Sequence, residues 1–193
     1  HFPTVLQGNY TGISLFHSTA DLLNYIKQYP NFKSGVQLLE TQSKNTIWAA
    51  GYNELNLIKF SEDFSEIKQI KPYAHQKGLP KSNYIGVFKL GEINVFTTDS
   101  GLYLYDELVD KFTPYQQVNK KLGTFAKSNK ITVAGNNSYW FIHKTRIALV
   151  NLLPGGEIKV DSIKLASLEG NMMKFYENIA HIDVNQYLIS IDN

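Results

Sequence analysis

The sequence predicts an all-β fold made of repeated four-stranded antiparallel units, and three features lead to this prediction. Aromatic residues make up 13% of the 193 residues, and aromatic side chains favour the pleated, half-buried surface of a sheet. Short apolar runs with period-two alternation are separated by tight turns. The same order of strand, turn and strand returns at a regular interval, which indicates structural repeats.

The repeat is clearest as a hairpin of two alternating runs around a short turn. Aligning four copies on the last residue of each turn gives spacings of 42, 47 and 45 residues. A further copy starts at QYLISIDN (186–193). The aligned turn residues are Gly12, Glu54, Gly101 and Arg146, in the hairpins 4–17, 46–59, 93–106 and 139–151.

Each hairpin is expected to gain one strand before it and one strand after it. Four antiparallel strands in about 45 residues are typical of a β-propeller blade. We therefore predict an all-β fold built from β-propeller blades. The flanking strands are expected at 34–42 and 67–74, at 84–90 and 111–118, and at 131–136 and 158–164.

Residues 1–193 are expected to form a single β-propeller segment of about four blades. Both ends of the sequence fall inside a hairpin, which favours a fragment of a larger propeller. The alternative is a closed four-bladed ring in which the C-terminal strands complete the first blade. The expected blades are 1–33 (partial), 34–80, 81–122, 123–170 and 171–193 (partial).

One segment departs from the strand pattern. In STADLLNYIKQYP (18–30), Ser18 is a suitable N-cap, and Leu22, Leu23 and Ile26 have helical spacing. We expect a short helix here in place of an outer strand, with these three apolar side chains facing the core.

The composition excludes several classes of site and partner. The chain has no cysteine, so disulfides, thiolate metal sites and cysteine nucleophiles are absent. The net charge of +2 is too small to indicate nucleic acid or an anionic membrane as a partner. No apolar run is long enough to span a bilayer, and the first ten residues do not have the pattern of a signal peptide.

Four motifs resemble those of the two-component-regulator propeller family. In sequence order, the first motif is a strand that contains tryptophan, and the second is a Gly-Leu-Pro connector between blades. The third is a hairpin with the pattern Thr-x-x-Gly-Leu-Tyr-x-Tyr-Asp, and the fourth corresponds to the last blade. Glu54 and Arg146 depart from this pattern, because the family prefers glycine there. The motifs are NTIWAAGYNELNLIKF (45–60), HQKGLPKSNYIGVF (75–88), VFTTDSGLYLYDELVDKFTPY (95–115) and FYENIAHIDVNQYLISIDN (175–193).

The resemblance implies a periplasmic ligand-binding sensor region of a bacterial hybrid histidine kinase or helix-turn-helix regulator. Such regulators place a three-tyrosine domain, a membrane helix and a cytoplasmic output after the propeller. For this segment, the resemblance implies a sensor role without catalysis. It also implies that the segment contacts other domains of the same regulator.

The residues that carry chemistry do not form a catalytic pattern. Asp99, Asp106, Glu107 and Asp110 cluster near one hairpin, where turn formation explains them better than acid–base catalysis. The five histidines show no metal-ligand spacing. Trp48, Phe96, Trp140 and Leu188 recur at one repeat position, which indicates packing between neighbouring units.

The loops that enter the innermost strand of each blade ring one mouth of a propeller, and loops on a rigid scaffold often bind ligands. Amide and hydroxyl groups there suit a small polar ligand or an oligosaccharide, while tyrosine covers an apolar sugar face. The candidate ligand-binding residues are Lys33, Ser34, Lys81, Ser82, Asn83, Tyr84, Tyr176, Glu177 and Asn178.

Three functions are left open by these residues. The first is a sensor segment without catalytic residues, metal or cofactor, for which a second copy of the chain is also a candidate partner. The second is a scaffold whose open sheet edges pair with another protein. The third is a propeller glycosidase or lyase, for which Glu177 is the only acid near the start of an inner strand.

Overall fold

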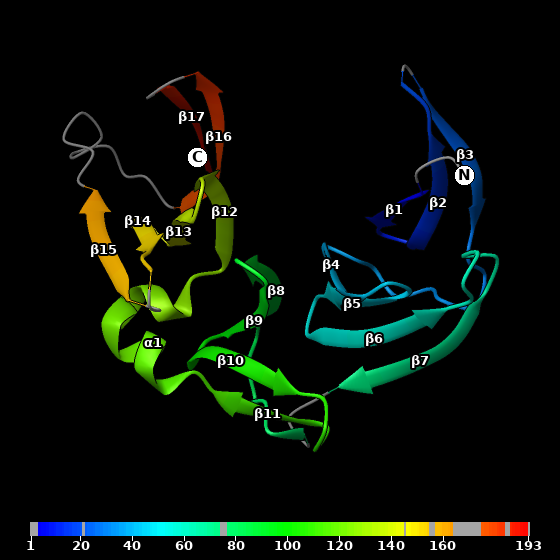
Figure 1. The fold of residues 1–193 in the computed structure, drawn as a ribbon, viewed down its shortest axis with the longest axis horizontal. Coiled ribbons are helices and arrows are strands. Elements are labelled where there is room, and N and C mark those ends of the chain that lie inside the picture. Colours follow the sequence, from blue (N-terminus) through cyan, green and yellow to red (C-terminus); the bar gives the residue numbers. More distant parts are fainter. Residues whose placement is uncertain are drawn as a thin grey trace. The chain divides into compact units, whose positions relative to one another are not determined.

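The computed structural model describes residues 4–20, 22–73, 77–144, 146–154, 157–163, 175–183 and 186–192. They fall into two compact units, His1–Val87 and Phe88–Asn193, and each is considered by itself. Both consist mainly of antiparallel strands, with one short α-helix and one 3-10 helix among the elements described (Figure 1). The prediction of an all-β chain with several four-stranded antiparallel sheets is confirmed.

The first unit contains two sheets, of three and four strands. Within each sheet, strands that follow one another in sequence lie side by side. The first sheet holds β1 (Thr4–Asn9), β2 (Gly12–Ser18) and β3 (Leu23–Gln28), and the second holds β4 (Leu38–Ser43), β5 (Thr46–Gly51), β6 (Glu54–Phe60) and β7 (Ile67–Tyr73).

The second unit contains two four-stranded sheets and a two-stranded one, again in sequential order. A short helical segment lies between the two larger sheets in sequence. The elements are β8 (Ile85–Leu90), β9 (Ile93–Thr98), β10 (Gly101–Asp106), β11 (Lys111–Pro114), α1 (Gln116–Leu122), the 3-10 helix Gly123–Lys127, β12 (Lys130–Gly135), β13 (Ser138–His143), β14 (Arg146–Leu152), β15 (Ile158–Ile163), β16 (Phe175–Asp183) and β17 (Gln186–Asp192).

The four aligned hairpins all have two-residue turns with the same register. The pairs that close them are Asn9 with Gly12, Gly51 with Glu54, Thr98 with Gly101, and His143 with Arg146. The repeat alignment made from sequence is therefore confirmed residue by residue at its central hairpin.

The turns reach this common register with different backbone conformations. Gly12 and Gly101 have φ angles of 133° and 131°, values that residues with a Cβ atom rarely adopt. Where Glu54 replaces glycine, Asn53 takes the left-handed conformation instead, with φ of 56°. Asparagine tolerates that region better than most residues, so the hairpin persists without the glycine.

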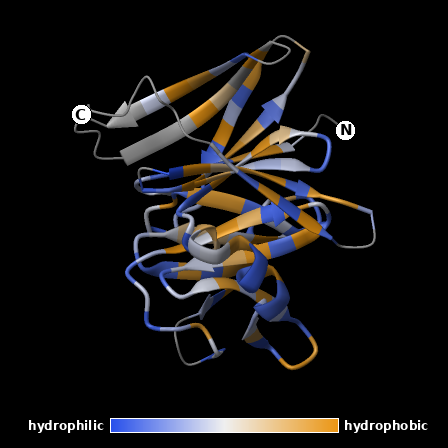
Figure 2. Ribbon diagram, turned by 90° about the vertical axis from the view of Figure 1, so that its left-hand side faces the viewer, coloured by the Kyte–Doolittle hydropathy of each residue, from blue (hydrophilic) through white to orange (hydrophobic). Residues whose placement is uncertain are grey.

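The core of the first unit is formed by both of its sheets. Apolar and polar residues alternate along many strands of the chain, as Figure 2 shows. Because successive side chains point to opposite faces, this alternation directs one face of each sheet inward. The buried members are Ile13, Leu15, Tyr29, Phe32, Val36, Ile47, Ala49, Ile58 and Phe60.

The expected recurrence holds for two aromatic residues, because Trp48 and Trp140 each lie three residues before the pair that closes their hairpin, whereas Phe96 lies two residues before its closing pair and so is one position away. Trp48 packs edge-on against Tyr73 at 5.2 Å between ring centroids, and Phe96 packs in the same way against Phe112 at 4.8 Å. Trp140 is also buried. Leu188 departs from the expectation, because 63% of its surface is exposed.

The helix expected within residues 18–30 is wrong, because Leu23–Gln28 form strand β3. The cross-strand pair Phe16 and Tyr25 joins β3 to β2 with ring centroids 5.7 Å apart. Tyrosine and isoleucine favour such pairing over a helix. The expectation that Leu22, Leu23 and Ile26 face the core is also wrong, since 65%, 59% and 44% of their surfaces are exposed.

Two other expected strands are shorter in the structure. The strand placed at 34–42 starts at Leu38, and the strand placed at 111–118 ends at Pro114. Proline has no N–H to continue the ladder, and helix α1 follows. The Asn119 side chain then accepts a hydrogen bond from the Leu102 backbone N at 2.8 Å and donates one to the Leu102 oxygen at 2.9 Å. It thereby occupies the backbone groups that a strand would pair.

We predict that Asn119→Ala lowers the free energy of unfolding by about 1–3 kcal/mol, because it leaves the Leu102 N–H of a buried strand without this partner. Urea denaturation measures the change. The neighbouring exposed position offers a control, since Gln117→Ala removes an amide from the same helix. Equal stabilities of the two variants would contradict the role given to Asn119.

Candidate functional site

The candidate site is a cavity of about 410 Å³ in the first unit, called here the connector pocket. It lies between the β1–β2 turn and the segment that leaves β3. Its lining combines aromatic rings with an amide, a hydroxyl and an ammonium group. The lining residues are Tyr10, Thr11, Gln28, Tyr29, Pro30, Phe32 and Lys33.

The β1–β2 turn is held in place by side-chain amides. Asn9 Oδ1 accepts hydrogen bonds from the backbone N and the hydroxyl of Thr11, both at 2.9 Å. From the end of β3, Gln28 Nε2 donates to the Thr11 oxygen and hydroxyl, also at 2.9 Å. Asx geometry of this kind is a common local reason for a turn. The polar wall of the pocket is therefore preorganised.

The segment after β3 lies unusually close to two hairpin turns. Val36 N donates to the Asn9 oxygen, and Gln37 N donates to the Ala50 oxygen, each at 2.9 Å. These two bonds tie the start of the second sheet to the turns of both hairpins. The connector therefore determines where the β1–β2 turn stands over the pocket.

Glycine makes this close approach sterically possible. A Cβ atom added to Gly12 would lie 2.3 Å from the Phe32 oxygen, and one added to Gly51 would lie 2.2 Å from the Gly35 oxygen. Both distances are far below van der Waals contact, so only glycine fits.

Two tyrosines project from equivalent positions of these turns. Tyr10 is 94% exposed and forms part of the pocket rim, and Tyr52 is 77% exposed on the neighbouring turn. Gly35 lies close to the backbone of both turns. A Cβ atom added to Gly35 would be 3.3 Å from the Tyr10 oxygen, and the Gly35 oxygen lies 2.2 Å from where a Cβ atom of Gly51 would be. An exposed ring at a pocket rim can stack on the apolar face of a ligand.

Tyr29 forms the buried floor of the pocket. Its hydroxyl donates to the Phe64 oxygen at 2.6 Å, and its ring packs edge-on against Phe60 at 5.1 Å. Lys27 Nζ lies 5.3 Å from the ring centroid. Burial raises the pKa of Tyr29 to about 12, and the charge of Asp63 adds to this effect. The hydroxyl is thus a structural donor at ordinary pH.

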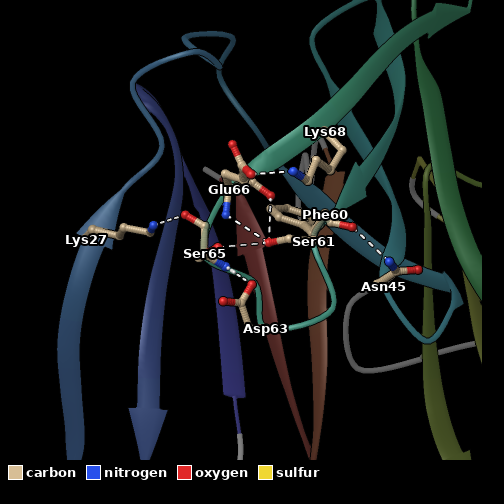
Figure 3. Close-up of polar contacts among 8 residues, drawn as sticks. All are labelled: Lys27, Asn45, Phe60, Ser61, Asp63, Ser65, Glu66 and Lys68. Carbon is tan, nitrogen blue, oxygen red and sulfur yellow. Dashed lines mark hydrogen bonds and ion pairs between the residues drawn. The ribbon is translucent and has the colours of Figure 1, made fainter.

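The loop beneath Tyr29 is a compact polar network (Figure 3). The Ser61 hydroxyl accepts a hydrogen bond from Glu66 N at 3.1 Å, and Asp63 Oδ1 accepts one from Ser65 N at 3.0 Å. Hydrogen bonds from Ser61 and Ser65 hold the pKa of the Asp63 carboxyl well below its usual range. Lys27 Nζ donates to the Ser65 oxygen, which links this loop to β3.

The structure places the candidate residues predicted from sequence in different ways. Lys33 lines the connector pocket, whereas Ser34 follows it in the chain and does not line that cavity. Ser82 and Tyr84 form a local turn in which the Ser82 hydroxyl donates to the Tyr84 oxygen at 2.6 Å. Lys81 and Asn83 are exposed in the same segment, which lines neither of the two cavities described here.

The last three candidates, Tyr176, Glu177 and Asn178, belong to β16. Their backbone is described but their side chains lie outside the described part of the chain. Their proposed contact with a ligand therefore stays a prediction.

Sequence reasoning missed most of the pocket lining. Gln28, Tyr29 and Pro30 fall in the segment 18–30 predicted to hold a helix, and Tyr10 falls in the predicted hairpin 4–17 without being among the candidate ligand-binding residues. The signal that was available is the recurrence of tyrosine at equivalent turn positions, Tyr10 and Tyr52. The contact between the β1–β2 turn and the connector has no local sequence signature.

A second cavity of about 430 Å³ lies in the same unit. Leu6, Leu39 and Ile47 contribute apolar walls, and Glu40 and Lys44 contribute charge. Glu40 Oε1 already accepts a hydrogen bond from Thr41 N at 3.0 Å. This cavity lacks the exposed aromatic rim and the tethered turn, so the connector pocket is the better candidate.

The described residues contain no group of three or more acidic or histidine side chains placed to hold a metal ion. The lining of the connector pocket contains neither a histidine nor a carboxylate, the side chains that general acid–base catalysis uses most often. Asp106 serves the turn after β10, accepting a hydrogen bond from Leu108 N at 2.9 Å. The geometry of the pocket supports binding through stacking, hydrogen bonds and one positive charge.

The chain matches no protein-family model, and no curated protein matches it either. Among the helices that the structure describes, none has the length and apolar character needed to cross a membrane.

We predict that Gly51→Ala lowers the free energy of unfolding by about 1–3 kcal/mol, because the Gly35 backbone must move away from the new methyl group. Gly135→Ala is the matched control, since no heavy atom lies within 4 Å of a Cβ there. Its expected effect is below about 1 kcal/mol. Urea denaturation of both variants checks the comparison, and equal losses would show that the close approach is not limiting.

A second prediction concerns alkaline pH. Because the pKa of Tyr29 is about 12 in the folded chain and 10.0 ordinarily, its contribution to stability is complete below pH 10. That contribution is lost as the pH rises from 10 towards 12. Denaturation midpoints measured across this range should therefore fall less steeply for Tyr29→Phe than for the wild type. Parallel curves would rule out Tyr29 as a source of the decline.

Proposed function

We propose that this chain is a β-propeller segment that acts as a periplasmic sensor region of a bacterial two-component-type regulator. It binds a small polar ligand, of which an oligosaccharide is the leading class, and catalyses no reaction. The observation that carries the proposal is the connector pocket, where a tethered turn presents an exposed tyrosine beside an amide and an ammonium group. Ligand binding is relayed through other domains of the regulator.

The repeat geometry supports the propeller interpretation. Successive antiparallel sheets use the same two-residue hairpin at equivalent positions. Three of the described sheets have four antiparallel strands in sequential order, as a propeller blade does. Within its own sheet, a buried aromatic residue of the second strand packs against a ring of the outer strand, as Trp48 does with Tyr73 and Phe96 does with Phe112.

The chemistry of the pocket supports a polar ligand. Tyr10 can cover an apolar sugar face, and Gln28 and Thr11 present amide and hydroxyl groups at the wall. Lys33 adds a positive charge at the mouth, which favours a ligand with hydroxyl or acidic groups. Concave sites with a few fixed polar groups are typical of small-molecule binding.

The alternative function is a protein-interaction scaffold, which the open edges of the sheets favour. A scaffold needs no ligand pocket, so binding of any small molecule in the connector pocket separates the two functions. A catalytic propeller would instead hydrolyse or cleave a glycosidic substrate, for which Glu177 remains the candidate acid.

The test is a thermal-shift screen of the 193-residue chain against neutral and acidic oligosaccharides. A ligand at about ten times its dissociation constant should stabilise the chain by about 1.4 kcal/mol. Tyr10→Ala should weaken that binding about tenfold, an effect typical of one lost aromatic contact. Tyr52→Ala is the matched control, because it removes an exposed ring from the equivalent turn position outside the pocket lining.

Three results would contradict the proposal. They are the absence of any stabilising saccharide, equal loss of affinity in both tyrosine variants, and turnover of a saccharide during the assay. The last result would favour the enzyme interpretation instead.

A further inference from the structure

The outer strands of the sheets are not alike in how they protect their free edges. Natural edge strands commonly carry lysine, other charges or proline, which discourage pairing with another chain. Strand β7 carries Lys68, Lys71 and Pro72, and β11 carries Lys111 and Pro114. The outer strand β15 has charges as well.

Strand β3 lacks this protection. Its sequence, LNYIKQ, contains one residue that is charged at neutral pH, Lys27. The Lys27 ammonium group turns toward its own unit, where it donates to the Ser65 oxygen and lies near the Tyr29 ring. In the part of the chain that the structure describes, β3 pairs only with β2, so its other edge is open.

The open edge is flanked by an exposed apolar cluster. Leu22, Leu23, Tyr25 and Ile26 expose between 44% and 65% of their surfaces. The start of the strand is nevertheless held in place, because Thr19 N donates to the Leu22 oxygen at 2.8 Å. A contiguous apolar group on an ordered edge is a typical feature of a protein-interaction surface.

A β-bulge limits the regular part of this edge. Leu15 pairs with Lys27 and Phe16 pairs with Tyr25, so Ile26 is the extra residue on β3. Bulges interrupt regular pairing. The regular stretch is therefore Leu23–Tyr25, and its central residue is Asn24.

We infer that the open edge of β3 pairs with β3 of a second copy of this chain, antiparallel and centred on Asn24. Two identical antiparallel edges related by a two-fold axis pair symmetrically about one residue. Centring on Asn24 sets Leu23 opposite Tyr25 of the other copy, twice, and brings Leu22 toward Ile26 of the other copy. Apolar side chains then meet apolar side chains on both sides of the central Asn24 pair.

The same register also keeps the two Lys27 ammonium groups, one from each copy, far apart. Lys27 lies three residues from the symmetry centre, so the two copies of Lys27 are separated by six residue positions along the paired strands. At about 3.3 Å per residue, they stand roughly 20 Å apart and do not repel strongly. A register centred on Lys27 would place them side by side, and one centred on Tyr25 would set the lysine against Leu23.

The dimer is expected to be weak. Pairing of one short strand buries less than the roughly 1,200 Å² of total surface found in standard interfaces. Association should therefore be visible at protein concentrations between about 10 µM and about 1 mM. The inference is independent of the proposed ligand, since none of the four apolar residues lines the connector pocket.

The test is sedimentation equilibrium of the 193-residue chain over that concentration range. It compares the wild type with variants that carry a charge at the symmetry centre. Asn24→Lys places two ammonium groups opposite each other, and Asn24→Asp places two carboxylates there. Each variant alone should weaken dimerisation at least about tenfold, because like charges directly opposite destabilise a strand pair. An equimolar mixture of the two variants should restore dimers, since opposite charges then meet.

Gln69→Lys is the matched control, because it adds the same charge to the exposed face of the outer strand β7. It should dimerise like the wild type. Asn24 and Gln69 are both exposed, and thermal unfolding of each variant verifies the fold. A wild type that remains monomeric throughout the concentration range overturns the inference. So does a mixture of the two Asn24 variants that remains monomeric, or an Asn24→Lys variant that dimerises as well as Gln69→Lys.

Discussion

The close approach of the connector to two hairpin turns is the constraint on which the first unit depends. Two backbone hydrogen bonds, from Val36 to Asn9 and from Gln37 to Ala50, join the sheets through main-chain groups. Such bonds require the backbones to come within a distance that a side chain would prevent, and glycines at 12 and 51 leave that space. The connector pocket exists because this contact holds the β1–β2 turn over Tyr29. Burial of the apolar faces supplies stability to the sheets, whereas the glycines determine where one sheet begins beside the other.

The four aligned hairpins share the same register, although different residues produce it. Glycine forms the turn in two hairpins, and Asn53 takes a left-handed conformation where glycine is replaced. Asn119 provides side-chain partners for Leu102 where the outer strand of its sheet ends early. The common requirement is that backbone donors and acceptors of buried strands find partners. Different residues can meet that requirement, so the sequences of the repeats diverge further than their hairpins do.

Exposure separates the positions that stabilise the fold from those that can recognise another molecule. Trp48 and Phe96, in the second strands of their sheets, are fully buried and pack against outer-strand rings. Tyr10, at the tip of a turn, and Leu23 and Tyr25, on an edge strand, remain open to solvent. The two kinds of exposed group serve different contacts. A turn tyrosine beside a cavity suits a small ligand, and an uncharged strand edge suits the backbone of another chain.

The sequence by itself determined the all-β class, the position of every aligned hairpin and the buried role of Trp48 and Phe96, because period-two alternation and turn residues are local signals. It did not identify β3, where apolar residues at helical spacing belong to an exposed strand held by its pairing with β2. Of the six predicted ligand-binding residues whose side chains the structure describes, only Lys33 lines the connector pocket. Tyr10, Gln28 and Tyr29 meet there through contacts between a turn and a connector that are distant in sequence. Only the tertiary structure could decide these features, because strand pairing and backbone packing depend on partners that no local pattern specifies.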